Sequence, residues 1–152
     1  MNFNFNIVIT DCSYMFYNIS NITSIDLSNF DSSNVLNMSY MFSYSNKLQY
    51  INFPNFNTFS VLDMSYMFYN CFFLLSLDLS SFNTYNVIKM TSMFQHCSKL
   101  ESININSFRT PSLKNISYRF AYCNSLTSLN LSLFNTSFVN KLNFLFYQCY
   151  NL

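Results

Sequence analysis

The sequence has no glycine, few charged residues and no long apolar run, and each of these absences limits what the chain can be. Without glycine, tight turns have to be made by Asn, Asp and Ser, which tolerate left-handed backbone or bond to it with their side chains. Only 9% of the residues are charged and 51% are hydrophobic, which excludes a disordered chain. No apolar run reaches the roughly 18 residues of a membrane-spanning helix. The first ten residues also lack the basic start and continuous apolar stretch of a secretory signal.

Groups that serve catalysis or nucleic-acid binding are equally scarce. The single histidine, His96, stands in a column of aligned repeats that otherwise holds Asn, Tyr and Gln, so we interpret it as an exposed surface residue. Lys and Arg total 7 against 6 Asp and Glu, which leaves no basic footprint for nucleic acid. Because a catalytic site needs a nucleophile, base or metal in a convergent arrangement, the sequence predicts a chain that is not an enzyme and holds no cofactor.

One five-residue block recurs six times at a constant spacing of 26 residues. The blocks are CSYMF (12–16), MSYMF (38–42), MSYMF (64–68), MTSMF (90–94), ISYRF (116–120) and LNFLF (142–146). A fixed period of this length is typical of a stacked repeat protein, in which neighbouring units bury one another's apolar faces. We therefore expect a single elongated domain over residues 1–152.

Part of each repeat has the pattern of a short strand. Leu48 is followed at +3 and +5 by Ile51 and Phe53, and the same apolar offsets follow Leu74, Leu100 and Leu126. Apolar residues two apart mark a half-buried strand, whose other side chains face solvent. A phenylalanine and a polar stretch, which we interpret as a loop, come next in each repeat.

Within the recurring block the period changes to that of a helix. Met64, Met67, Phe68 and Cys71 stand at i, i+3, i+4 and i+7, which indicates one buried helix face. The resulting fold prediction is an α/β repeat solenoid, a right-handed, leucine-rich-repeat-like arc of about six coils, with short parallel strands on one face and short helices on the other. Its coils would be a partial one at 1–23 and then 24–49, 50–75, 76–101, 102–127 and 128–152.

These residues carry a resemblance to a known family. The pattern of Leu48, Ile51, Phe53 and Phe56 resembles the LxxLxL of leucine-rich repeats. The segment LDLSSFNTYNVIKMTSMFQHCSKL (77–100) resembles the repeat of BspA-like surface proteins of bacteria and protists, a unit also found in a family of unknown function among mycoplasma lipoproteins. The resemblance covers nearly the whole chain and implies a cell-surface or extracellular adhesin repeat that attaches to host or matrix proteins.

Two weaker interpretations involve the acidic residues and the cysteines. Asp26 and Asp78 share a strand column two coils apart, a separation that suits a pair of glycosidase carboxylates, but the surrounding Ser and Asn give neither a reason to be protonated. The repeat spacing of Cys71, Cys97, Cys123 and Cys149 is within reach of disulfides between coils, yet the equivalent positions also hold Ile19 and Ser45. We expect a buried column of thiols and no metal site.

Charge is unevenly distributed along the chain. Residues 1–80 hold one Lys and five Asp, a net charge of 1 − 5 = −4, whereas the remainder holds six basic residues and one Glu, 6 − 1 = +5. Together with the absence of polar capping repeats, this predicts a segment of a longer array, or head-to-tail self-association of acidic and basic ends. Arg119 stands in a column of Met and Leu, which we interpret as drift in a degenerate repeat.

Two surfaces are candidates for binding a partner. The first is the polar strand face, formed by Ser24, Asp26, Ser28, Tyr50, Asn52, Ser76, Asp78, Ser80, Asn104, Asn106, Asn130 and Ser132. The second is an aromatic column on the predicted helix side, formed by Tyr14, Tyr40, Tyr66, Tyr118 and Phe144, whose rings are also placed to stack on one another. The sequence predicts a non-enzymatic module that binds an extracellular or host protein or glycan, without nucleic acid or membrane insertion. The alternatives are a structural spacer, a self-associating array segment or a decayed array, none of which has a ligand of its own.

Overall fold

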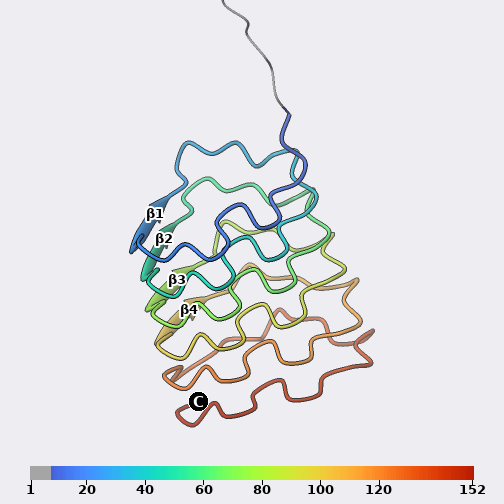
Figure 1. Cartoon of the computed structure of the whole chain (residues 1–152). Helices are drawn as coiled ribbons and strands as arrows, with labels where there is room; N and C mark the ends of the chain where they lie inside the picture. Colours follow the sequence, from blue (N-terminus) through green and yellow to red (C-terminus); the bar gives the residue numbers. More distant parts are fainter. Residues whose placement is uncertain (1–7) are drawn as a thin grey trace, which may run out of the picture.

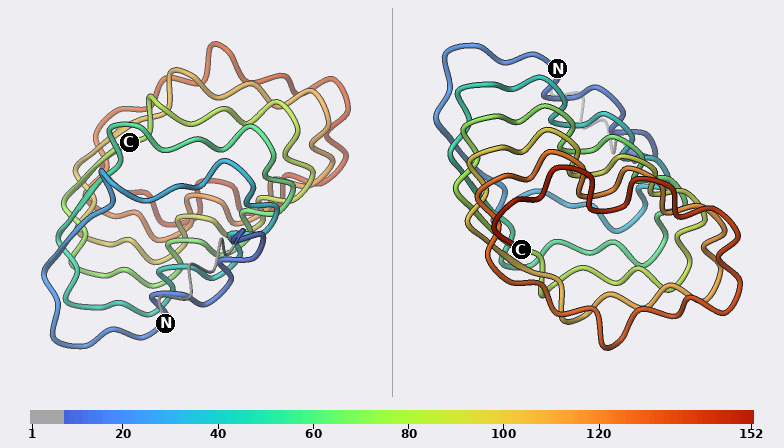
Figure 2. Two further views of the ribbon diagram at one scale, coloured as in Figure 1. Left: turned by 90° about the horizontal axis from the view of Figure 1, so that it is seen from above. Right: turned by 90° about the horizontal axis from the view of Figure 1, so that it is seen from below.

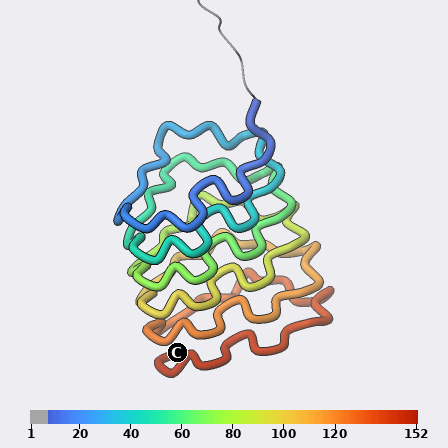
Figure 3. Tube along the Cα trace, in the orientation of Figure 1, coloured from blue at the N-terminus to red at the C-terminus, as the bar shows by residue number. Residues whose placement is uncertain are grey.

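The computed structural model describes residues 8–152, which form a stack of coils laid one on another (Figure 1). Every residue that pairs across neighbouring coils lies 26 positions from its partner, so each coil takes 26 residues. Viewed along the stack, the coils follow similar paths around a shared interior (Figure 2), and the chain advances one coil at a time from blue to red (Figure 3). Residues 1–7 of the expected coil 1–23 lie outside the described residues.

Short strands occupy the same point of four successive coils. They are β1 Ser24–Asp26, β2 Tyr50–Asn52, β3 Ser76–Asp78 and β4 Ser102–Asn104. β1 pairs in parallel with β2, and β3 with β4, in a register that sets Ile25 opposite Ile51 and Leu77 opposite Ile103. The central residue of each strand points to the interior and the flanking side chains point mainly to solvent, as the alternating pattern predicts.

The strand expected near Leu129 and Leu131 is not formed. Within the described residues, no backbone hydrogen bond joins this segment to β4, and a strand is defined by such pairing. Leu129 and Leu131 nevertheless pack against the core, so the apolar pattern is explained by burial alone.

Two ladders of phenylalanine rings fill the interior. Phe16, Phe42, Phe68, Phe94, Phe120 and Phe146 stack in order with centroids 5.3 to 5.8 Å apart. Phe30, Phe56, Phe82, Phe108 and Phe134 form the second ladder at 5.5 to 6.5 Å. Each ring buried in this way contributes about 1.5 to 3 kcal/mol relative to an exposed one. One coil cannot obtain this burial alone, which is why the repeats stack.

The predicted α/β solenoid with helices on one face is wrong, because no residue in 8–152 is helical. Met64, Met67, Phe68 and Cys71 are fully buried, as expected of the inner face, but they are carried by linked turns. The Met67 N–H donates to the Met64 carbonyl at 3.4 Å, and the Cys71 N–H donates to the Phe68 carbonyl at 3.2 Å. Two such turns in sequence bury i, i+3, i+4 and i+7 as a helix would, so the period did not distinguish them.

The third residue of each of these turns has a left-handed backbone conformation, which is incompatible with an α-helix. Tyr66 has φ 59° and Asn70 has φ 57°, the sign that a type II turn requires and an α-helix excludes. The N–H groups of Tyr66, Phe68 and Asn70 donate to carbonyls of the next coil at 2.8 to 2.9 Å. Backbone bonds that a helix would close within itself therefore hold neighbouring coils together.

The left-handed positions form two columns, one of which begins at Tyr14 and the other at Asn18. The columns contain Tyr14, Tyr40, Tyr66, Ser92, Tyr118 and Phe144, and Asn18, Tyr44, Asn70, His96, Tyr122 and Gln148. The expectation that Asn, Asp and Ser make the turns is thus only partly right. A bulky residue in this region costs about 1 to 2 kcal/mol, and stacking of the aromatic members offsets that cost.

Candidate binding surfaces

The twelve residues of the predicted strand face are all exposed or half-buried in the structure. Their side chains form a ladder of local and inter-coil hydrogen bonds. Asp26 accepts bonds from the backbone N–H and the hydroxyl of Ser28, and from the amide Nδ2 of Asn52 at 3.2 Å. One coil pair further on, Asp78 accepts the Ser80 N–H and the Asn104 Nδ2, both at 3.0 Å. Much of this surface is therefore satisfied by its own neighbours.

Pro54 interrupts the ladder. In the other coils this position holds Ser28, Ser80, Asn106 or Ser132, each of which donates its N–H to the Asp or Asn two residues earlier. Proline has no N–H to donate, so Asn52 forms no such turn. A backbone hydrogen bond between coils is also missing here. The N–H groups of Leu27 and Leu79 each donate to a carbonyl of the next coil, but the Phe53 N–H forms no equivalent bond among the described residues.

A shallow polar hollow of about 240 Å³ lies at this interruption, between β2 and β3. Its lining includes the side chains of Asn52, Pro54, Asp78 and Ser80. Tyr50 stands on the same face of β2 as Asn52, about 7 Å away along the strand. Its side chain is 51% exposed, and the equivalent positions of β1, β3 and β4 hold Ser. The hollow thus combines a carboxylate, an amide, a hydroxyl and a nearby aromatic ring.

The acidic residues of this face are held in their charged form. Hydrogen bonds from the Ser28 hydroxyl and N–H lower the pKa of Asp26, and the Ser80 N–H and hydroxyl lower the pKa of Asp78. A glycosidase needs one carboxyl group with a raised pKa to act as general acid. Neither Asp26 nor Asp78 is in an environment of that kind.

The aromatic column predicted on a helix side lies instead on the turns. Tyr14, Tyr40 and Tyr66 stack with centroids 4.8 and 4.7 Å apart and ring planes within 8°, and Tyr118 stacks on Phe144 at 5.0 Å. Ser92, which is buried, separates the two groups. The stacking interpretation of this column is confirmed within each group, although Tyr14 and Phe144 remain about half exposed.

A second aromatic ladder runs beside the first, and the sequence alignment did not reveal it. It passes through Tyr17, Tyr44, Tyr69, His96, Tyr122 and Tyr147, with neighbouring centroids 4.2 to 5.7 Å apart. Tyr17, Tyr69 and Tyr147 belong to one column of the repeat, and Tyr44, His96 and Tyr122 belong to the next, so neither column is aromatic throughout. His96 is correspondingly not an exposed helix residue: it is half-buried, stacks on Tyr122 at 4.2 Å, and has a pKa lowered by burial.

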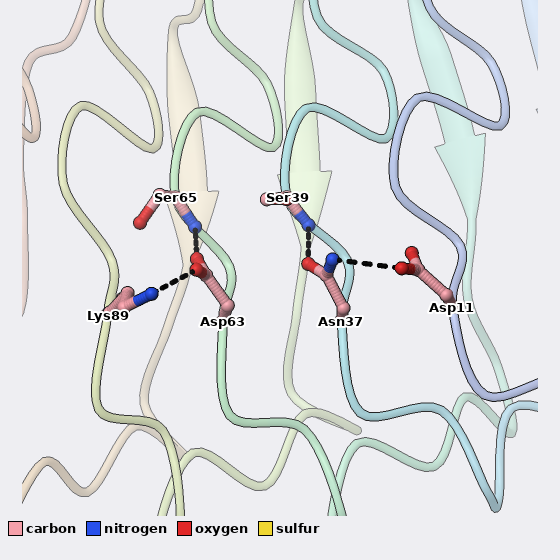
Figure 4. Close-up of polar contacts among 6 residues, drawn as sticks. All are labelled: Asp11, Asn37, Ser39, Asp63, Ser65 and Lys89. Carbon is pink, nitrogen blue, oxygen red and sulfur yellow. Dashed lines mark hydrogen bonds and ion pairs between the residues drawn. The ribbon is translucent and has the colours of Figure 1, made fainter.

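A row of polar side chains runs across neighbouring coils at the point where the loop of each repeat leads into the turns (Figure 4). Asn37 donates to Asp11 at 3.2 Å, and the Lys89 ammonium lies 3.3 Å from an Asp63 oxygen. Asn37 and Asp63 also accept the N–H of Ser39 and Ser65. The row begins with Asp11 and ends with Lys141, so it follows the charge polarity of the chain.

Comparison with known families identifies the family of this repeat chain. The family described as "Mycoplasma protein of unknown function, DUF285" matches residues 2–76 and again residues 73–152. The chain belongs to this family. The resemblance to repeat proteins is therefore shown at the level of DUF285, whose description gives no function and does not single out BspA-like proteins. No curated protein and no solved structure matches the chain.

Two buried columns of this DUF285 chain carry hydrogen bonds between coils. Cys71, Cys97 and Cys123 are free, fully buried thiols, each 3.1 Å from a phenylalanine carbonyl of the preceding coil, which confirms the predicted thiol column for these members. Ser45 makes the equivalent bond to Phe16 at 2.7 Å. A row of buried Thr, which the loop interpretation missed, does the same: the Thr84 hydroxyl donates to the Arg109 carbonyl at 2.8 Å.

The structure offers no metal centre within residues 8–152, since no three His, Cys, Asp or Glu side chains lie close enough together. No helix in this part of the chain is long and apolar enough to cross a membrane.

Proposed function

We propose that this chain is a non-enzymatic binding module whose strand face binds an extracellular glycan or protein. The observation that carries the proposal is the hollow beside Pro54, where the ladder is interrupted and the side-chain oxygen of Asn52 accepts no hydrogen bond among the described residues. Specific recognition usually needs only a few such groups in a shaped site.

The composition of the hollow favours a glycan. A sugar ring offers hydroxyl groups that donate to a carboxylate such as Asp78 and pair with the amide of Asn52, and its C–H face packs on an aromatic ring such as Tyr50. The charged state of Asp78 makes it an acceptor only, which suits a neutral ligand rich in hydroxyl groups. A shallow site of this kind gives weak affinity, so repeated contacts along a longer array would add avidity.

The similarity of residues 77–100 to BspA-like repeats supports a place at the cell surface, as part of an adhesin. Fold and family membership do not establish this role. Attachment to host or matrix proteins, and self-association of the acidic and basic ends, stay predictions of the same kind.

A structural spacer is the second candidate, and the ladder itself favours it. Hydrogen bonds between neighbouring coils already occupy several polar groups of the strand face, as expected of a rod without a ligand: Asn52 donates to Asp26, and Asn104 donates to Asp78. A spacer predicts that changes in the hollow leave every interaction of the protein unaltered.

A binding panel separates these candidates. The purified chain is tested against immobilised glycans and extracellular-matrix proteins, beside a variant with Tyr50→Ala, Asn52→Ala and Asp78→Ala together. Tyr85→Ala is the matched control, because this tyrosine is 56% exposed and lies outside the strand face. Saturable binding that the triple variant loses and the control keeps supports the proposal. If binding is lost in a Tyr40→Ala variant and kept in the triple variant, the binding site lies on the aromatic turns. If the folded chain binds nothing on the panel, the spacer is favoured.

A further inference from the structure

Arg119 is a buried cation without a hydrogen-bond partner. It occupies the column of Met41, Met67 and Met93, and its side chain is fully buried. Within the described residues, none of its three guanidinium nitrogens has a hydrogen-bond partner. The guanidinium lies instead over the ring of Phe134, whose centroid is 5.1 Å from Cζ. The guanidinium does not reach water, as a long side chain at such a position usually would.

Arg119 also forms part of the wall of a cavity of about 250 Å³. Apolar side chains from two neighbouring coils form most of its wall: Ile116, Phe120, Leu131, Phe134 and Leu145. The polar contributions come from Arg119 and Thr136. The hydroxyl of Thr110, one coil earlier, donates to a carbonyl at 3.2 Å, whereas the Thr136 hydroxyl makes no such bond within the described residues. The cavity is therefore largely apolar, and Arg119 and the exposed Thr136 are its polar lining residues.

Among the described residues, no acidic side chain lines this cavity or pairs with the Arg119 guanidinium. Burial lowers the pKa of Arg119 to about 9, which leaves the guanidinium protonated at neutral pH. An unpaired buried charge is among the most costly features a fold can carry. An anion that entered the cavity would remove this cost and gain the charge-assisted bonds that a guanidinium forms with a carboxylate.

We infer that the cavity binds a small apolar monocarboxylate, such as a medium-chain fatty acid. The carboxylate pairs with the Arg119 guanidinium and takes a bond from Thr136, and the hydrocarbon packs against Leu131, Phe134 and Leu145. An apolar cavity of about 150 Å³ already takes up benzene, so this one has room for a short alkyl or aryl chain. A phosphate is disfavoured, because its additional oxygens would face hydrocarbon.

The test uses the whole chain and octanoate below its micellar concentration. Octanol matches the chain length without the charge, and acetate matches the charge without the chain. We expect octanoate to raise the unfolding temperature in a concentration-dependent manner, and calorimetric titration to give a dissociation constant about 10- to 100-fold lower than for octanol. Equal responses to octanoate and octanol, or a response to acetate as large as that to octanoate, would overturn the assignment.

Variants locate the site. Arg119→Met should abolish the preference for octanoate over octanol, whereas Arg109→Met, which removes an exposed arginine of the same coil, should retain it. A full octanoate response in a folded Arg119→Met variant would contradict the inference. If that variant does not fold, nitrogen-15 resonances of the arginine side chains in the wild type still decide the question. One guanidinium should shift with octanoate and stay unchanged with octanol, and no shift would count against the site.

Discussion

Replacement of Arg119 by methionine should stabilise the ligand-free protein, because it removes an uncompensated buried charge. Burial lowers the pKa of Arg119 to about 9, a fall that corresponds to about 5 kcal/mol of destabilisation of the charged form. Contact with the Phe134 ring offsets about 1 to 2 kcal/mol of this. Methionine fits the same column elsewhere, at Met67 and Met93, without exposure. We expect a net gain of about 2 to 4 kcal/mol in the free energy of unfolding.

Thermal and urea denaturation in a buffer free of carboxylates measure this gain. At about 2 to 4 °C per kcal/mol for a chain of this size, the unfolding temperature should rise by about 5 to 15 °C. The matched change Arg109→Met, at an exposed site, should alter stability by no more than about 0.5 kcal/mol. An Arg119→Met variant that melts below the wild type would refute the reasoning, since it would mean that the guanidinium has a partner or reaches solvent.

The pH dependence supplies a second check with a definite sign. Arg119 has a lower pKa in the folded than in the unfolded chain, so the unfolded state binds more protons in the interval between the folded-state pKa of about 9 and the higher pKa of the unfolded chain. The destabilisation is complete below pH 9 and fades as the pH rises through that interval. The difference in stability between Arg119→Met and the wild type should therefore be constant from pH 6 to 8 and smaller at pH 10.5.

Three further predictions concern other positions. Pro54→Ser restores the N–H that the turn at Asn52 lacks, so any ligand that the triple variant fails to bind should also be lost, while stability changes by less than about 1 kcal/mol; unchanged binding would separate the hollow from function. Burial raises the pKa of the Cys97 thiol well above its ordinary value, so the wild type should lose stability as the pH rises above about 9, where unfolded thiols ionise. Cys97→Ser should weaken that loss in denaturation at pH 7 and pH 10, and an identical pH dependence would argue against a buried thiol. Ser92→Gly relieves a left-handed residue with φ 53° and should stabilise by about 0.5 to 1 kcal/mol, whereas Ser65→Gly, outside the left-handed columns, should destabilise by about as much in urea denaturation.

The 26-residue period was sufficient to locate the buried columns and the four strands that form, although it also predicted a strand near Leu129 that does not. Leu77 and Leu79 alternate with polar residues, and β3 lies where that alternation predicts. Burial of this kind depends on which residues recur at one position of the repeat, and recurrence can be read directly from a sequence. The polar strand face followed from the same alternation.

The helices could not be distinguished from linked turns by this means, because both bury Met64, Met67, Phe68 and Cys71. The choice depends on where the backbone N–H groups find acceptors. Tyr66 and Asn70 donate to the next coil, an option that exists only when another coil is packed alongside. Glycine would have signalled the left-handed positions, but Tyr, Ser and His occupy them in this chain.

The period of the repeat, the inward columns and the outward polar row are thus properties of the linear sequence, since each depends on local alternation or recurrence. Other features depend on side chains that lie about one coil apart in sequence and meet only after the coils stack. These features are the hollow at Pro54, the aromatic ladder from Tyr17 to Tyr147 and the cavity lined by Arg119. In the sequence, a single proline or arginine at one position of a repeat is indistinguishable from random substitution. The neighbouring coils show which hydrogen bond the proline cannot form and that the charge of the arginine has no partner. Those relations are distances in space, and the tertiary packing of the coils sets them.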